Sequence, residues 1–545
     1  MRKLEKQMPE SPSPVPAPEA GTAAEGLDGG GRTAAAVLRA VRSPRSPVLL
    51  LRRKEAATRT AVLPHVEVLP GPDWIVDGTM PGTYPEWLGD QDFCARHGLR
   101  FPYVVGEMAN GIATTTMVAA AAESGLLGVF GAGGLAPGQV EEALERLNRE
   151  IGEKRPWGVN LIHSPVEPAA EQAVAALLIR HRVPVVSLSA FMELTPAVLR
   201  VALGGIRQAA DGTVLRPRRI IAKVSRPETA RVFMSPAPAD QVRALVAAGT
   251  LTAEEGKLAA RIPVAGDITA ESDSGGHTDN RPLTALLPRL LALRDEVARQ
   301  HGSAVSVGAA GGLGTPEAVA AAFAAGAAYV VTGSINQTTV EAGVSRRARE
   351  LLAAADFHDV VMAPAADMFE LGVRVQVLSK GTMFAHRARR LHELYRQHAS
   401  LTDIPAADLR RLERDVFHAS VADIWTETER FWTRRDPREL ERAAQDPRHR
   451  MALLFRWYLG QASRWAIQGE PDRALDYQLW CGPALGAFNH WITGSFLADP
   501  QRRTVAQVAL NLLEGATVVT RAHQLRSLGV PVPAEAFSYR PRPLA

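Results

Sequence analysis

The stretch 305–334 of the chain reads VSVGAAGGLGTPEAVAAAFAAGAAYVVTGS. An apolar run at 305–311 ends in two glycines, a helix start follows at Thr315, and a second apolar run covers 328–333. Continuous apolar runs are typical of strands that are buried on both faces, and a strand–helix–strand order implies parallel strands joined by a right-handed crossover. The stretch therefore predicts one βαβ unit of a parallel α/β fold.

The same pattern recurs upstream, where six further apolar runs alternate with alanine-rich segments of helical length. Eight such units match a (β/α)8 TIM barrel, in which active sites are built on the loops that follow the strands. An insertion near 236–262 is expected to add two helices between the fifth and sixth strands. The eight predicted strands are 103–109, 128–133, 157–163, 184–190, 220–225, 264–269, 305–311 and 328–333.

The rest of the chain divides around this barrel, which we expect at 101–350. Residues 1–60 are rich in proline and glycine and nearly free of aromatic residues, a composition that favours a disordered tail. Residues 61–100 are expected to form an ordered lead-in segment. After residue 350 the strand pattern stops and charged helical stretches with six of the nine tryptophans follow. This pattern predicts a helical C-terminal region at 351–545.

Composition and charge exclude several classes of protein. Hydrophobic residues make up 46% and charged residues 22% of the chain, which excludes a wholly disordered, collagen-like or coiled-coil protein. The net charge of +4 gives no indication of nucleic-acid binding. No apolar run reaches the roughly 18 residues of a membrane span, and Arg2 and Lys3 precede no apolar segment, so we expect neither membrane insertion nor secretion but a cytoplasmic protein. Cys94 and Cys481 are far apart, which predicts two buried apolar side chains and neither a disulfide nor a cysteine metal site.

Two glycine-rich loops follow the seventh and eighth predicted strands. One carries Gly311 and Gly312, and the other carries Gly333 and Ser334. Glycines let backbone N–H groups approach an anion, and the N-terminus of a following helix favours a phosphate. These loops therefore predict a phosphate site in the usual barrel position, the alternative being tight turns alone. A G-x-G-x-x-A pattern at 131–136 lacks the acidic residue that a dinucleotide fold places after the next strand, so we interpret it as a barrel turn.

The loop after the sixth predicted strand carries a candidate acid. Gly275 and Gly276 precede His277, so the backbone can lie against a flat ligand while nearby acids raise the pKa of the imidazole. A purely structural histidine is the alternative. His277 and Asp279 would be two metal ligands without a third at suitable spacing, and we predict no metal site.

Polar residues also stand at the ends of three other predicted strands, namely Asn110, Asn160 and Lys223. A buried lysine needs an anionic partner. A reduced flavin, which is negative near N1, would be one such partner, and Glu107 or another acid of the barrel would be the other.

Six long motifs between residues 106 and 483 resemble a known family, and the likeness runs from about residue 70 to 520. They are GEMANG at 106–111, AKVSRP at 222–227, ESDSGGHTDNRP at 271–282, MAPAADMFE at 362–370, FRWYLG at 455–460 and DYQLWCGP at 476–483. The chain thereby resembles the FMN-dependent barrels of the nitronate monooxygenase and flavin enoyl reductase superfamily. More specifically, it is similar to the PfaD-type enoyl reductases, which act in trans in polyunsaturated fatty acid and polyketide synthases.

The resemblance implies a bound FMN that is reduced by NADPH or NADH, and a 2-enoyl thioester on an acyl carrier protein as the substrate. A hydride would pass from flavin N5 to the β-carbon, and a proton would reach the α-carbon. His277 and Lys223 are implied as the catalytic residues. The implied cofactor-binding residues are Met108, Asn110, Asn160, Lys223, Gly275, Gly276, Gly311, Gly312, Gly333 and Ser334.

Two other functions stay open from the sequence. A nitronate-oxidising flavoenzyme would use His277 as a base, although this reading gives no account of the C-terminal extension. A non-catalytic synthase subunit is the other. Arg387, Arg389 and Arg390 could meet an acidic carrier protein or could only form a solvated face. A homodimer is possible.

Overall fold

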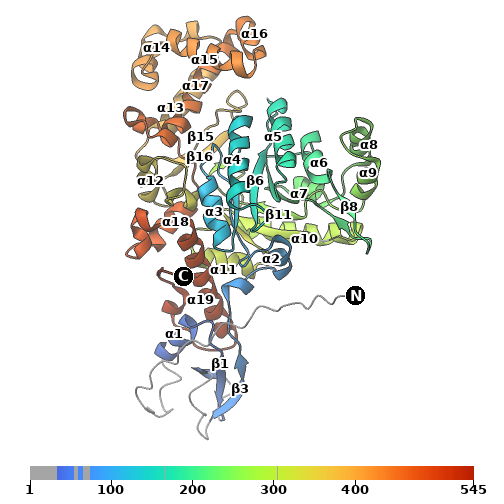
Figure 1. Cartoon of the computed structure of the whole chain (residues 1–545). Helices are drawn as coiled ribbons and strands as arrows, with labels where there is room; N and C mark the ends of the chain where they lie inside the picture. Colours follow the sequence, from blue (N-terminus) through green and yellow to red (C-terminus); the bar gives the residue numbers. More distant parts are fainter. Residues whose placement is uncertain (1–33, 55–58, 65–73, 166, 304, 545) are drawn as a thin grey trace.

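The computed structural model (Figure 1) contains a closed barrel of eight parallel strands, in the order β10-β11-β13-β14-β4-β5-β6-β7 around the ring. The structure describes residues 34–54, 59–64, 74–165, 167–303 and 305–544. The barrel strands are β4 (Tyr103–Val105), β5 (Leu127–Phe130), β6 (Trp157–Ile162), β7 (Val185–Ser189), β10 (Arg219–Val224), β11 (Asp267–Glu271), β13 (Ser306–Ala310) and β14 (Val330–Thr332). The predicted α/β barrel fold is confirmed.

Helices surround the barrel, and side chains along each strand alternate between these helices and the barrel interior. In β10, Ile220 and Ala222 pack in the cluster shared with the helices, whereas Ile221 belongs to a cluster inside the barrel. Lys223 therefore points inward. The helices are α3 (Thr115–Glu123), α4 (Pro137–Glu150), α5 (Pro168–Arg180), α6 (Pro196–Leu203), α7 (Pro227–Met234), α8 (Ala239–Ala247), α9 (Ala253–Ala259), α10 (Leu283–His301) and α11 (Pro316–Ala324). Helices α8 and α9 form the insertion between β10 and β11.

Helix α2 (Gln91–His97) closes the N-terminal end of the barrel. Its Phe93 ring stacks on Tyr329 at a centroid distance of 4.1 Å. His97 Nε2 lies 2.8 Å from Oδ2 of Asp267, the first residue of β11, and Arg96 donates to the other carboxylate oxygen at 3.0 Å. With this end filled, the C-terminal end of the strands is the open end, as the barrel fold predicts for a ligand site.

The predicted tail at 1–60 is wrong from residue 34 onward. Helix α1 (Ala34–Arg42) is followed by β1 (Val48–Arg53) and β2 (Arg59–Pro64), and β1 also pairs with β3 (Trp74–Met80). Figure 1 shows this unit beside the end of α19 (Val505–Ser527). The apolar face of α1 packs against residues of α19 in one cluster, so its burial depends on a partner far along the chain. The part of the tail at 1–33 lies outside the described residues.

The C-terminal region at 351–545 is not entirely helical, contrary to the prediction. Strands β15 (Val360–Pro364) and β16 (Arg374–Leu378) pair antiparallel, and β12 (Gly276–His277) joins β16 to complete a sheet of three strands. These strands escape prediction because their third strand comes from a barrel loop. Besides α19, the larger helices here are α12 (Arg346–Ala353), α13 (Phe384–Gln397), α14 (Ala406–Leu412), α15 (Val421–Arg435), α16 (Arg438–Gln445), α17 (Pro447–Gln468) and α18 (Ala484–Trp491).

Candidate functional site

A buried polar cluster forms the floor of the open end of the barrel. Lys223 Nζ lies 3.1 Å from Glu107 Oε1 and 3.0 Å from Glu271 Oε1. Glu107 also accepts hydrogen bonds from the hydroxyls of Ser187 at 3.0 Å and Ser189 at 2.7 Å. The sequence left two kinds of anionic partner open for Lys223, a reduced flavin or an acid of the barrel. In the structure, Lys223 forms ion pairs with two acids of the barrel, Glu107 and Glu271.

The charges of this floor stabilise one another. Burial alone would raise the pKa of Glu107, but Lys223 and Ser189 outweigh it and lower that pKa. Burial likewise opposes the charged form of Lys223, yet the carboxylates of Glu107 and Glu271 raise its pKa. An ammonium group is therefore fixed between two carboxylates at the centre of the barrel, because removing Lys223 would leave the buried carboxylate of Glu107 without its cation.

The two predicted phosphate loops present glycine backbone to open space above this floor. Gly312 has a left-handed backbone with φ of +72°, and no heavy atom lies within 4 Å of a Cβ added there or at Gly333. Thr315 caps α11 by accepting from the backbone N–H of Ala318 at 3.4 Å. Open space beside glycine N–H groups and a capped helix N-terminus fits the phosphate of a flavin nucleotide. Gly311, by contrast, is packed, since a Cβ there would lie 2.5 Å from Ser272 Oγ.

A segment of the C-terminal region joins the phosphate loop to the histidine loop. The backbone N–H of Gly482 donates to Ser334 Oγ at 3.1 Å. A Cβ on Gly275 would lie 2.7 Å from Cys481 Cα, so only glycine allows this close approach. Both Cys481 and Cys94 are free and buried, as predicted.

The loop that carries His277 is held by backbone pairing and by side chains. Gly276 pairs with Gln376, and His277 pairs with Val375, in the antiparallel ladder between β12 and β16. Gln376 donates to Asp273 Oδ1 at 2.9 Å and to the carbonyl of Ser274 at 2.8 Å. The loop is therefore attached to the C-terminal region along its whole first half.

The other half of the loop is attached to the barrel. Asp279 accepts from Ser225 Oγ at 2.6 Å and from Arg226 at 2.9 Å. These two residues directly follow β10, the strand that carries Lys223. The pKa of Asp279 is lowered to about 2, first by the hydrogen bond from Arg226. Asp279 thus attaches the loop to the barrel rim.

The imidazole of His277 has a carboxylate partner that the sequence did not predict. His277 Nε2 lies 3.1 Å from Asp367 Oδ2, and 41% and 55% of the two side chains are exposed. Burial would lower the pKa of His277, but the hydrogen bond and charge of Asp367, with a smaller effect of Glu271, raise it. A histidine that keeps its proton at higher pH is suited to donate a proton to a ligand at the rim.

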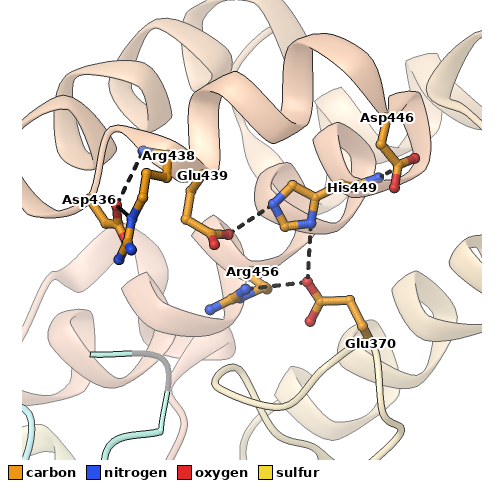
Figure 2. Close-up of polar contacts among 7 residues, drawn as sticks. All are labelled: Glu370, Asp436, Arg438, Glu439, Asp446, His449 and Arg456. Carbon is orange, nitrogen blue, oxygen red and sulfur yellow. Dashed lines mark hydrogen bonds and ion pairs between the residues drawn. The ribbon is translucent and has the colours of Figure 1, made fainter. Parts of the chain in front are cut away.

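Figure 2 shows how the helices support the connection between β15 and β16 that carries Asp367. Glu370, three residues further on, lies 3.3 Å from Arg456 Nη1 and 3.8 Å from His449 Nδ1, both on α17. His449 Nε2 is 2.8 Å from Glu439 of α16. The side chain of His449 is 2% exposed, so this polar cluster lies inside the helical part. Packing of α16 and α17 therefore fixes the loop that positions His277.

The remaining predicted cofactor residues are Met108 and Asn110, in the loop after β4, and Asn160, inside β6. Asn160, which is buried, accepts from the backbone N–H groups of Ala132 at 2.7 Å and Gly133 at 3.2 Å. The carbonyl of Gly133 in turn accepts from the N–H of Asn110, whose φ is +58°. A Cβ on Gly131 would lie 1.7 Å from the carbonyl oxygen of Met108. The G-x-G-x-x-A pattern is thus a barrel turn, as predicted, and five of its six N–H groups are already bonded within the chain.

The three arginines that could have met a carrier protein contact other residues of the chain. Arg387 forms an ion pair with Asp476, and Arg390 lies 3.8 Å from Glu393, so these arginines have partners within the chain. Arg389 donates to the carbonyl of Ala385 at 3.1 Å. Over the described ranges, no cluster of three or more His, Cys, Asp or Glu side chains could hold a metal ion. No helix in the described part of the chain is both long and apolar enough to cross a membrane.

The fold and the rim define a (β/α)8 barrel whose candidate site includes residues of the C-terminal region. Residues 95–391 match the nitronate monooxygenase family, and residues 398–477 match the inserted helical domain of acyl-carrier-protein S-malonyltransferase. The chain therefore belongs to the nitronate monooxygenase family, and its predicted likeness to the PfaD-type enoyl reductases is confirmed by the relatives described next.

Three relatives come from fatty acid and polyketide systems. A polyunsaturated fatty acid synthase subunit of Thraustochytrium sp. is 44% identical over 490 residues, which cover 88% of this chain and 32% of the relative. Polyketide biosynthesis protein PksE of Bacillus subtilis is 41% identical over 440 residues, covering 80% of this chain and 57% of the relative. The crystal structure of the enoyl reductase domain of MlnA from Bacillus amyloliquefaciens has a TM-score of 0.77 and 36% identity, covering 81% of this chain and 99% of that domain.

We predict that Asp367→Asn lowers the pKa of His277, because the amide keeps a hydrogen-bond acceptor but removes the negative charge. Titration of the histidine ring signals by NMR measures this pKa. Asp240→Asn, on the exposed face of α8, is the control and leaves the titration of His277 unchanged. An identical titration curve in the Asp367→Asn variant and the parent protein would contradict the assignment.

The pairing of His277 with Asp367 also contributes to stability, by an amount that depends on pH. Because the folded-state pKa of His277 is raised above 6.5, its contribution is complete below pH 6.5 and is lost as the pH rises through the folded-state value. Because the pKa of Asp367 is lowered from 3.8, its contribution is complete above pH 3.8 and is lost on acidification. The pair thus stabilises the loop most between these two pH values, by a small amount because both side chains face solvent.

Proposed function

We propose that this protein is an FMN-dependent enoyl reductase, which uses NADPH or NADH to reduce a 2-enoyl thioester held on an acyl carrier protein. The observation that carries the proposal is the His277–Asp367 pair, held at the barrel rim near glycine loops that fit a phosphate. The likeness to the enoyl reductase domain of MlnA supports the reaction type. The relatives in fatty acid and polyketide synthesis support a carrier-bound acyl group.

Each part of the rim has a role in this proposal. FMN, when bound, would supply the hydride for the β-carbon. The backbone N–H groups of Gly312 and Gly333 would hold the phosphate, and Ser334 would orient its loop through Gly482. Met108, Asn110 and Asn160 would line the flavin ring and ribityl chain, above the floor formed by Lys223 and its carboxylates.

His277 would act on the thioester. Its imidazolium would polarise the thioester carbonyl or deliver a proton to the α-carbon, and Asp367 would then stabilise the charged ring between turnovers. Proton donation requires the charged form, and the raised pKa of His277 keeps that form populated closer to neutral pH. The exposed position of the ring leaves room for a large, carrier-bound substrate to approach.

A nitronate-oxidising activity is the second candidate, since the match to the nitronate monooxygenase family covers the barrel. In that reaction His277 would have to accept a proton. The carboxylate beside it favours the protonated ring and so disfavours this role at neutral pH. Oxygen consumption with an alkyl nitronate distinguishes the two reactions, and a colourless protein that binds a synthase would support the non-catalytic alternative.

The proposal predicts that the purified protein is yellow and that, without oxygen, it oxidises one NADPH for each crotonyl thioester reduced. The thioester is presented on an acyl carrier protein, and the saturated product is measured by mass spectrometry. Oxygen is excluded so that flavin reoxidation cannot consume NADPH. A yellow protein that consumes NADPH while the double bond persists would overturn the proposed reaction.

His277→Gln should reduce kcat by about 10²- to 10⁴-fold, the usual contribution of a positioned acid, while leaving the FMN content of the protein unchanged. Turnover and the flavin absorbance of the same preparation provide the two measurements. His301→Gln, at the exposed end of α10, is the matched control and keeps both values. Full turnover in the His277→Gln variant would assign the proton transfer to water.

Gly312→Ala should weaken FMN binding by roughly tenfold or more, because the added methyl group would occupy the open space in which the phosphate is proposed to lie. Gly302→Ala is its control, since both glycines have a left-handed φ, +72° and +69°, and open space around an added Cβ. Both variants bear a similar backbone strain of about 1–2 kcal/mol. Only the first should lose flavin in a fluorescence titration, and equal loss in both would show that strain alone is responsible.

A further inference from the structure

A second concave site lies at the opposite, N-terminal end of the barrel. This cavity of about 940 Å³ is lined by the end of α2 and by the first residues of β6, β7 and β10. Its wall holds seven lysine and arginine side chains but a single acidic one, Glu153. No residue of this cavity takes part in the site proposed for FMN.

Four of these seven cations lack a carboxylate partner. Among the residues that the structure describes, Lys154, Arg182 and Arg219 form no ion pair and no side-chain hydrogen bond. Arg218 is 6% exposed and donates only to the backbone carbonyls of Val201 and Gly204. Lys154, Arg182 and Arg219 are exposed to solvent, so the cavity presents positive charge that no carboxylate of the described residues pairs with.

Placing cations around the cavity removes part of their solvation, and this affects the two arginines at the start of β10. Loss of solvation lowers the pKa of Arg218 and of Arg219, and the charge of Glu255 at Arg218 and of Asp267 at Arg219 offsets only part of this effect. Cations are common at helix C-termini, where they complement the helix dipole, and this accounts for Lys154 and Arg182 near the ends of α4 and α5. It does not account for Arg218 and Arg219, which stand at the start of β10.

Arg182 also occupies an unusual backbone position. It follows the C-terminal cap of α5 with φ of +50°, a left-handed conformation in which glycine is the most common residue. An arginine there bears a strain that glycine avoids, and within the described residues its guanidinium gains no partner in return. The geometry points to a ligand outside the chain as that partner.

We propose that this cavity binds a polyphosphate group, such as the diphosphate of a nucleotide-sized molecule. Several unpaired cations on one wall match a ligand with more than one negative charge, and the guanidinium fork fits phosphate oxygens in pairs. The volume lies within the range of about 300–1,000 Å³ that is usual for small-molecule sites. Because NADPH has to reach the flavin at the other end of the barrel, this is a separate site.

Calorimetric titration of the FMN-loaded full chain at low salt tests the proposal. The probes are orthophosphate, pyrophosphate and tripolyphosphate, with tetraglutamate as a carboxylate of comparable charge. One site per chain is expected, with an affinity that rises with the number of phosphates and exceeds that for tetraglutamate. The readout is heat of binding, so the result does not depend on the proposed reductase reaction.

Two variants and a control localise the site. Arg182→Gly and Arg219→Gln should each weaken tripolyphosphate binding by about tenfold or more, as expected for a lost charge-assisted contact. Arg430→Gln and Arg434→Gln, on the exposed face of α15, remove the same charge elsewhere and should have no effect. The Tm of Arg182→Gly should not fall, which a merely structural role for Arg182 would not predict. Non-saturable binding, equal binding of tetraglutamate, or equal loss in the control variants would each overturn the proposal.

Discussion

The pairing of β12 with β16 is the constraint on which the candidate site depends. Only two residues of β12 take part, Gly276 and His277, and so short a strand has no stability of its own. It is held because its partner strand belongs to a sheet whose connecting loop is fixed by α16 and α17. The position of the imidazole is therefore set by a region that lies outside the barrel.

The barrel and the C-terminal region therefore contribute different parts of the candidate site. The barrel provides the charged floor around Lys223 and the open glycine loops, which are features of a cofactor site. The C-terminal region provides the partner of the histidine, Asp367, and the contact of Gly482 with the phosphate loop. A barrel without this region would keep the open glycine loops but lose the strand pairing and the carboxylate that orient His277.

The sequence predicted the features that local pattern determines. Eight buried strands were recognisable because each is apolar on both faces and ends in glycine or polar residues. Thr315, the phosphate loops and His277 were recognisable because they stand at strand ends. By contrast, His277 and Asp367 are 90 residues apart, and α1 is buried by α19 from the other end of the chain. Contacts of this kind follow from three-dimensional pairing, which composition and periodicity do not encode.

The two ends of the barrel differ in how completely their cations are paired, since three of the seven cations around the N-terminal cavity have carboxylate partners. At the open end, Lys223 and Arg226 each have carboxylates from other elements, so the site is complete in charge before any ligand binds. At the closed end, Arg218 and Arg219 are partly desolvated and form no ion pair with a carboxylate among the described residues. Arg219 is exposed to solvent, whereas Arg218 is buried, and the unpaired cations around these two residues are the basis of the proposed polyphosphate site.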